Sequence, residues 1–338
     1  MNFINILNHI LRPLKWVVAQ LLTLFHHALV TFGMTAGPSP AWGIAIMCLV
    51  LVIRICLLPL FLSQMRAMQR IQVLQPQIQR IQHKYAARKD PRSKEAMQRE
   101  IMALQQRYNA NPLGSCLPSL IQAPILCSLF YTLQSLPAIA DGNAEPLGGI
   151  DHTMAGDIES SSIFGVRIAD SFGTVASPQS RIIIGVAVAL MCLTLFAIQW
   201  MLIHRNTSKD AMVSPQFRVQ KMTVFVFPAI YVVSGATLPF GVLLYWLTNN
   251  LWNLGQTLCQ LRWFPTPGSA AGERKARRDY EQDNRRRAAA GLPSLEEERA
   301  MAAREEAKAR REREKSAASR NRKQHKTPHL AKRSIVKR

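Results

Sequence analysis

Five apolar stretches divide the first 261 residues of the chain. A helix that crosses a membrane takes about 20 mostly apolar residues, and a backbone in lipid must satisfy its own hydrogen bonds. The fourth stretch is short and Ala236–Pro239 separates it from the fifth, so we expect these two to form a tight hairpin. The predicted spans are Ala41–Leu62, Leu117–Leu136, Ile182–Ile203, Met222–Gly235 and Phe240–Leu261.

Apolar residues recur at helical spacing through the first 33 residues, with polar residues largely between them. This pattern favours an amphipathic helix at the membrane surface, so we assign residues 1–40 to an external interfacial helix and its linker. A signal peptide and a sixth span are the alternatives. Arg12 and Lys15 ahead of Trp16–Phe25 resemble a signal sequence, but no clear cleavage site of small residues follows.

Residues 63–111 contain two runs of apolar residues at helical spacing, separated by Asp90, Pro91 and Arg92. Asp is a good N-cap and Pro is favoured at the first helical position. We therefore expect an antiparallel helical hairpin in the cytoplasm, kinked at Pro76. Because two thin apolar stripes are marginal alone, a partner or the membrane surface is expected to support it.

The chain has 338 residues, of which 48% are hydrophobic, and yet it carries a formal net charge of +21. Lys and Arg are in excess in residues 63–116, in 204–221 and after Leu261, whereas the loop 137–181 is acidic, irregular in composition and rich in Gly, Ser and Asp. Under the positive-inside rule the basic segments are cytoplasmic and the acidic loop is external. Five spans then place the N-terminus outside and the C-terminus in the cytoplasm.

The tail, residues 263–338, has few large apolar residues and is expected to be largely disordered, with a helix within Ser294–Ser316 at least on binding. After Leu261 there are 23 Lys and Arg against 11 acidic residues, a net +12. This charge suits a polyanion such as ribosomal RNA. It suits anionic lipid headgroups equally well.

Arg54 lies near the centre of the first predicted span. A guanidinium at that depth costs roughly 3 kcal/mol or more, and it cannot lose its proton. A buried charge needs a partner, but none of the predicted spans contains Asp or Glu. We therefore expect Arg54 to face protein or a water-filled cavity, in preference to an ion pair with a neighbouring span.

The fifth span carries polar residues on one helical face, because its amides follow Trp246 at offsets of three, four, seven and ten. With Arg54 and with amides of the second and third spans they would line a shared hydrophilic groove. The alternative is that they bridge packed helices. The candidate groove residues are Arg54, Gln122, Gln199, Trp246, Asn249, Asn250 and Asn253.

The sequence contains no phosphate-binding Gly loop, no nucleophile motif and no paired carboxylates in a plausible pocket. Its six cysteines lie in or beside the apolar stretches without metal-ligand spacing. We therefore expect neither an enzyme nor a bound metal, cofactor or small-molecule substrate.

Three ordered motifs, Asn111–Pro124, Ile53–Gln69 and Pro239–Asn250, resemble core segments of the YidC/Oxa/Alb membrane protein insertases. The resemblance covers about Trp42–Leu261. It implies five core spans around a groove that is open to the cytoplasm and to lipid but closed outside, with Arg54 matching the family's groove arginine. The chain lacks the large external domain of some members, and its long basic tail resembles that of members that bind ribosomes.

The resemblance implies a multi-pass protein of the bacterial cell membrane that inserts and helps fold nascent membrane proteins, alone or beside the Sec translocon, without a nucleotide. Two other classes remain. A small transporter would use Arg54 as an anion site, but we find no inverted repeats or paired broken helices. A membrane-anchored ribosome-binding protein would have passive spans.

Overall fold

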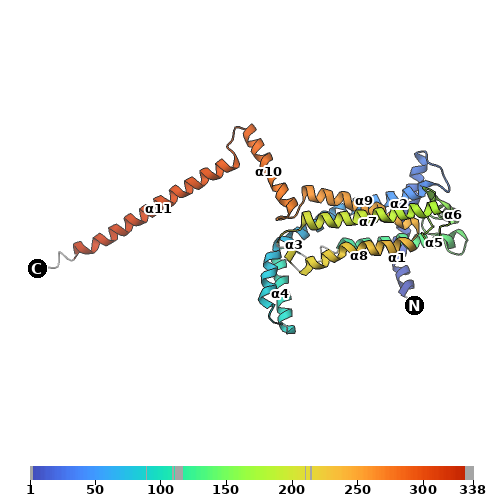
Figure 1. Ribbon diagram of the computed structural model, residues 1–338, viewed down its shortest axis with the longest axis horizontal. Coiled ribbons are helices and arrows are strands. Elements are labelled where there is room, and N and C mark those ends of the chain that lie inside the picture. Colours follow the sequence, from blue (N-terminus) through green and yellow to red (C-terminus); the bar gives the residue numbers. More distant parts are fainter. Residues whose placement is uncertain are drawn as a thin grey trace. The chain divides into compact units, whose positions relative to one another are not determined.

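The computed structural model describes residues 3–88, 90–108, 110, 117–209, 211–213 and 215–331, most of them in helices (Figure 1). The chain divides into two units, residues 1–273 and 274–338. The fold is that of an all-α polytopic membrane protein, as the sequence predicts. The larger unit contains α1 (Phe3–Thr31), α2 (Pro40–Cys56), α3 (Leu58–Tyr85), α4 (Pro91–Arg107), α5 (Leu117–Ala140), α6 (His152–Ser160), β1 (Ser162–Ile163), β2 (Val166–Arg167), α7 (Pro178–Asn206), the short 3-10 helix η2 (Ala211–Val213), α8 (Pro215–Thr237) and α9 (Phe240–Trp263).

The bundle packs around α9, which contacts α2, α5 and α7, while α8 packs on α7. Four described helices contain segments long and apolar enough to cross a membrane, and the bent pair of α2 and α3 brings the number to five. The four segments lie in α1, α5, α7 and α8. We predicted a span at Phe240–Leu261, but α9 is not among the helices that are apolar enough. The side-chain amides of α9 explain why its hydropathy is lower than that of the four. The packing of α9 inside the bundle shields these amides from lipid.

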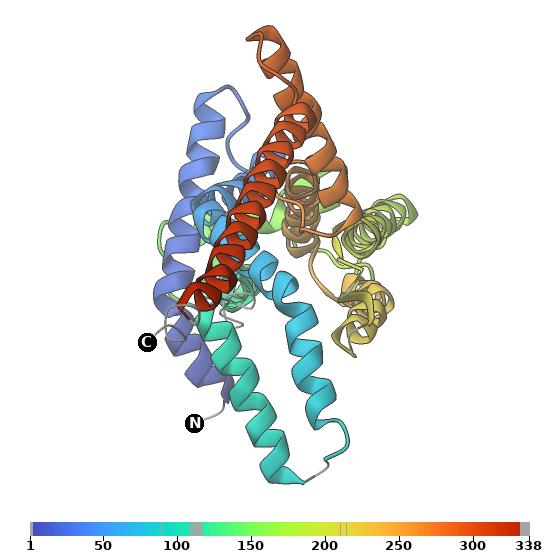
Figure 2. The same cartoon turned by 90° about the vertical axis from the view of Figure 1, so that its left-hand side faces the viewer.

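The helix α1 lies across the direction of the bundle (Figure 2). It is seen along its length in the view in which α7, α8 and α9 are seen end-on. It packs on α2 and α5 through buried apolar residues that include Leu11, Val18 and Leu22. Its length and composition also fit a span, so the interfacial helix stays a prediction.

The predicted first span, Ala41–Leu62, is two helices and not one. α2 and α3 meet at Leu57 with a bend of 54°. Pro59, in the first turn of α3, lacks a backbone N–H and its ring would clash with the carbonyl of Ile55 in a continuous helix. The break places Arg54 in the last turn of α2.

The loop 141–177 is folded, which corrects the prediction that the acidic external loop is irregular. It contains α6 and an antiparallel pair of two-residue strands, β1 and β2. Ile150, Ile158 and Ile168 bury their side chains in the main apolar core. The sequence prediction weighed the polar residues of this loop and missed its widely spaced isoleucines.

Backbone carbonyls of this loop cap the start of α9. Phe240 N–H donates to the Asp170 carbonyl at 2.7 Å, and Gly241 N–H donates to the Ile168 carbonyl at 2.9 Å. The first N–H groups of a helix have no partner within the helix, so the loop supplies the acceptors. A Cβ at Gly241 would lie 2.7 Å from Ile168 Cγ2, so this close approach requires glycine.

The helices α3 and α4 form the predicted helical hairpin, and α3 includes Pro76 within its length. The hairpin has a small apolar core in which Leu74, Ile78 and Ala110 are buried. The Asp90 carboxylate accepts a hydrogen bond from Ser93 N–H at 2.8 Å, as expected of an N-cap. This hydrogen bond lowers the pKa of the Asp90 carboxyl. The final residue of the predicted hairpin, Asn111, lies outside the described residues.

The tail is helical over α10 (Ala270–Ala289) and α11 (Leu295–Ala331), which differs from the predicted, largely disordered segment. Ion pairs one helical turn apart support these helices, among them Arg277–Glu281 and Arg310–Glu314, each at 3.0 Å. The side chains of residues 295–317 are almost all exposed.

We predict that Leu74→Ala opens the hairpin while Val73→Ala does not. Leu74 is 3% exposed and its neighbour Val73 is 54% exposed. Removing a buried leucine side chain costs about 2–5 kcal/mol, so hydrogen exchange of the α3 and α4 amides should accelerate about 30-fold or more. Equal exchange rates in the two variants, measured by mass spectrometry, would show that this core does not hold the hairpin together.

Candidate functional site

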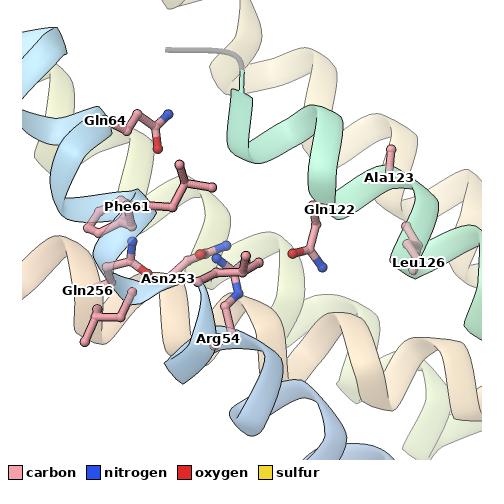
Figure 3. Close-up of a pocket in the computed structure, with 11 residues that line it drawn as sticks. Arg54, Phe61, Gln64, Gln122, Ala123, Leu126, Asn253 and Gln256 are labelled. Carbon is pink, nitrogen blue, oxygen red and sulfur yellow. The ribbon is translucent and has the colours of Figure 1, made fainter. Parts of the chain in front are cut away.

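A cavity of about 440 Å3 lies at the end of the bundle from which the α3–α4 hairpin extends, which we call the hairpin end (Figure 3). Helices from three parts of the chain form its wall: the junction of α2 and α3, the start of α5, and the second half of α9. The lining residues are Arg54, Leu57, Leu58, Leu60, Phe61, Gln64, Gln122, Ala123, Leu126, Asn253 and Gln256.

Arg54 is half-buried and its partner is an amide. Its Nε donates to Asn249 Oδ1 at 2.8 Å, and its Nη2 donates to the same oxygen. Within the described part of the chain no carboxylate forms an ion pair with Arg54. Its position in the last turn of α2 brings the charge close to free helix carbonyls, which stabilise a cation. The site therefore holds the guanidinium in place without neutralising it.

The polar residues of α9 divide between two faces of the helix. Asn249 contacts Arg54, and Asn253 and Gln256 line the cavity. Trp246 faces α8 instead, where Tyr231 stacks on it at 5.0 Å between ring centroids, and Asn250 is buried within the bundle. Neighbouring residues of an α-helix point about 100° apart, so the amides at 249 and 250 cannot share one surface.

Gln122 lies opposite Arg54 across the cavity, on α5 (Figure 3). It donates a hydrogen bond to Tyr245 Oη, and Tyr245 itself is 1% exposed. This contact joins α5 to α9. Gln199 lies outside the cavity and donates to Thr223 Oγ1 at 3.3 Å, so it bridges α7 and α8 as an amide between packed helices does.

The structure thus brings Arg54, Gln122, Asn249 and Asn253 together and places the other candidates, Gln199, Trp246 and Asn250, elsewhere. The list of candidates omitted the contribution of α3, namely Phe61 and Gln64, as well as Gln256 and Tyr245. The sequence contains a pattern that could have indicated the contribution of α3. Leu57, Phe61 and Gln64 follow Arg54 at intervals of three, seven and ten residues, which is the spacing of one helical face.

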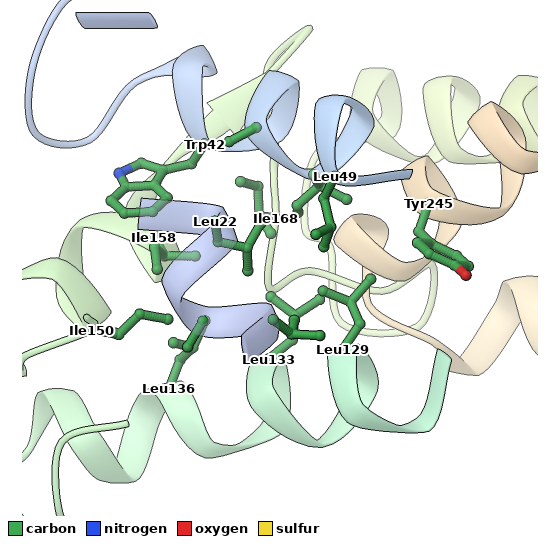
Figure 4. Close-up of a cluster of buried hydrophobic side chains, with 14 of the residues drawn as sticks. Leu22, Trp42, Leu49, Leu129, Leu133, Leu136, Ile150, Ile158, Ile168 and Tyr245 are labelled. Carbon is green, nitrogen blue, oxygen red and sulfur yellow. The ribbon is translucent and has the colours of Figure 1, made fainter. Parts of the chain in front are cut away.

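A solid apolar core separates the cavity from the opposite end of the bundle. That end, which carries the folded loop 141–177, is called the loop end here. Figure 4 shows Leu129, Leu133 and Leu136 of α5 packed with Leu22, Leu49, Ile158 and Ile168, and Tyr245 lies at the edge of this cluster. The bundle is therefore hollow and polar at the hairpin end, and a core of apolar side chains separates this hollow from the loop end.

The cavity combines an unneutralised cation, side-chain amides and a leucine-rich wall. Amides both donate and accept hydrogen bonds, so they suit water or an extended peptide backbone. No group of His, Cys, Asp or Glu in the described residues has the arrangement of a metal site. The site is suited to holding a polar, anionic segment beside apolar surface.

The family model described as 60Kd inner membrane protein matches residues 34–266. The chain belongs to this family, the YidC/Oxa family. Relatives called membrane protein insertase YidC include one from Bifidobacterium longum, 44% identical over 306 residues, which are 90% of each chain. One from Streptomyces avermitilis is 35% identical over 77% of this chain and 59% of its own length. One from Tropheryma whipplei is 31% identical over 81% of this chain and 90% of its own.

The match to the YidC/Oxa family model runs from the linker before α2 to the end of α9. It therefore includes every wall of the cavity and leaves out α1 and the helical tail. Membership of this family, together with the apolar helices, identifies a multi-pass protein of the bacterial membrane. Residues 111–116 of the motif Asn111–Pro124 lie outside the described residues.

We predict that the cavity admits water-soluble reagents and that the loop end does not. In a chain freed of its native cysteines, Asn253→Cys should react quickly with a hydrophilic maleimide in membrane vesicles open to the reagent. Val242→Cys, on the same helix but 1% exposed in the core, should react at least about tenfold more slowly. Equal labelling rates at the two positions would mean that the cavity is closed to water.

Proposed function

We propose that the protein is a membrane protein insertase and folding chaperone. Its relatives carry the name insertase, and the cavity around Arg54 is the structural feature that supports the same role here. A hydrophilic segment of a nascent membrane protein enters the cavity at the hairpin end. The adjacent apolar segment of the client then passes into lipid along α5 and α9. We further propose that the protein works alone or beside the Sec translocon.

The observation that carries this proposal is the pairing of Arg54 with the neutral Asn249. A cavity at the hairpin end shortens the apolar barrier that a polar segment must cross, because a charge is expensive only where lipid surrounds it. An arginine whose charge no carboxylate cancels raises the local potential for anions. An acidic client tail is thereby drawn to the point where the solid half of the bundle begins.

The direction of insertion follows from the charge of the loops. The basic hairpin and tail favour a cytoplasmic hairpin end, and the acidic loop 141–177 favours an external loop end. We therefore propose that the N-terminus is outside and the C-terminus in the cytoplasm. In this orientation the cavity receives clients from the side on which proteins are made, and the apolar core prevents leakage on the other.

The test is insertion of a small single-span client with an acidic outer tail into liposomes that contain only this protein. We predict that Arg54→Ala lowers the insertion rate about tenfold or more, a change well within the Coulomb energy of a charge pair near a protein surface. Arg54→Lys should keep most of the activity. Asn249→Asp should act like Arg54→Ala, because it turns the neutral acceptor into a counter-ion of nearly the same shape.

The same client with a neutral tail provides the matched control, since it should insert nearly equally in all four proteins. If Arg54→Ala and Asn249→Asp insert the acidic client as fast as wild type, Arg54 does not drive insertion. If wild type inserts neither client, the ribosome-binding protein with passive spans becomes the better explanation.

The helical tail favours RNA over lipid as its partner. Residues 295–315 contain seven basic and seven acidic residues, a net charge of zero, whereas residues 316–338 contain eight Lys or Arg and no acid. Lipid binding is served by basic residues directly beside a span. Residues 262–294, directly after α9, contain eight basic and four acidic residues, a net charge of only +4. A neutral stretch of α11, about 30 Å long at 1.5 Å per residue, separates them from the most basic block. We propose that this block contacts ribosomal RNA.

A comparison of two variants with equal loss of charge tests the RNA contact. Replacing Arg320, Arg322, Lys323 and Lys326 by Gln should reduce the salt dependence of ribosome binding, the slope of log K against log salt, by about 3. Replacing Arg304, Lys308, Arg310 and Arg313 by Gln should change it by less than about 1. Equal effects, or a loss of binding to anionic liposomes but not to ribosomes, would assign the tail to lipid.

A further inference from the structure

A second cavity, of about 570 Å3, lies at the loop end, away from Arg54. It is open to solvent and is lined by the end of α1, the linker 32–39, the start of α2, and α6 with its cap. Its lining includes His26, His27, Gly37, Trp42, Asp151 and Asp157. This volume is in the range of sites for small organic ligands and is much larger than a single ion requires.

The wall of this cavity contains buried polar atoms without a protein partner. The His26 and Trp42 rings stack at 3.8 Å with an angle of 8° between their planes. His26 is 6% exposed and Trp42 is 1% exposed. Neither ring nitrogen of His26, nor Nε1 of Trp42, has a hydrogen-bond partner in the described structure. In Figure 4 the indole nitrogen of Trp42 points away from the apolar cluster. Buried polar groups are normally paired, so these atoms indicate a missing partner.

Two carboxylates complete the wall. Asp151 caps α6, because its carboxylate accepts a hydrogen bond from Met154 N–H at 2.7 Å. Asp157 lies next to Gly37: a Cβ added to Gly37 would be 4.0 Å from both carboxylate oxygens of Asp157. In the described residues neither carboxylate takes part in an ion pair. The two carboxylates call for a cation that donates hydrogen bonds, and the donor Trp42 Nε1–H calls for an acceptor oxygen on the same ligand.

We propose that this cavity binds a primary ammonium group, carried by a lipid headgroup or by a small soluble amine. An ammonium has three N–H donors, which match the carboxylates of Asp151 and Asp157 and one ring nitrogen of His26. The rest of the cavity has room for the carbon chain that carries the group. The described residues offer no cluster for a metal ion, and a quaternary ammonium has no N–H to give to the imidazole.

Such a ligand would fasten α1 to the loop end. His26 and His27 belong to α1 and the two aspartates belong to α6 and its cap, so the ammonium bridges two elements that meet across the cavity. Its effect is on the stability of this junction and is independent of insertion activity.

The test compares thermal unfolding of the full chain in nanodiscs of phosphatidylethanolamine, phosphatidylcholine or phosphatidylglycerol, with and without free ethanolamine. The ethanolamine lipid should raise Tm by about 3 °C over the choline lipid. Asp157→Asn should remove this difference, and so should Asp151→Asn, in which Asn can still cap α6. Asp141→Asn, an exposed aspartate outside the cavity, is the control for lost charge and should keep the full difference.

The arms separate the two sources of the group. A rise in Tm with the ethanolamine lipid alone identifies a headgroup, and an equal rise with free ethanolamine in the glycerol lipid identifies a soluble amine. Equal Tm values in the ethanolamine and choline lipids, or an undiminished difference in Asp157→Asn, would overturn the proposal. Either result would leave the proposed role of Arg54 in client insertion untouched, because that role is tested separately.

Discussion

The hydrogen bonds between Arg54 and Asn249 are the interaction on which the rest of the groove depends. They link the end of α2 to the middle of α9, and they hold a charge inside the bundle with an amide in place of a counter-ion. Such a charge is tolerable only under three conditions. The helix must end nearby, so that its carbonyls face the guanidinium; water must reach the site; and lipid must be kept away. The break at Leu57, the cavity and the packing of α9 inside the bundle meet these conditions in turn.

The contrast between the two halves of the bundle follows from where the main apolar core lies. Large apolar residues fill the space where α1, α2, α5, α6 and α9 converge. Nearer the hairpin end, α5 and α9 present Gln122, Asn253 and Gln256 around open space. Because the cavity occupies one half of the bundle and the apolar core the other, a polar segment has to cross only about half of the apolar thickness. A membrane protein that held a polar channel along its full length would leak, and one without any hollow would give a hydrophilic segment no path.

The helices and the hairpin with its Asp90 cap could be predicted from the sequence, because they depend on local patterns. The special position of Arg54 could be predicted because the free energy of placing a charge in lipid is large. The prediction placed all the α9 amides on one face, although the neighbours Asn249 and Asn250 point about 100° apart. Asn249 contacts Arg54 of α2, whereas Asn250 is buried within the bundle. The folded loop was missed for another reason, because it depends on contacts between distant segments, such as Ile168 with Gly241, that no local window contains. The bend at Leu57 has a local cause in Pro59, but the apolar run continues through it and predicts one span. Tail helices were underestimated because their ion pairs lie one turn apart along an otherwise polar sequence.

The caps at the start of α9 have a mechanical consequence. Two backbone hydrogen bonds from Phe240 and Gly241 clamp that end of the helix to the folded loop, and a close contact at Gly241 leaves no slack there. The other end of α9 borders the cavity, where fewer side chains fill the space beside it. The chain directly after α9 is also held, because Gln69 Nε2 donates to the carbonyls of Phe264 and Pro265 and Thr266 N–H donates to Asn206 Oδ1. The part of α9 that borders the cavity therefore lies between two fixed ends. Any movement of the helix beside the cavity is a bowing between these ends, which leaves the backbone caps at the loop end in place.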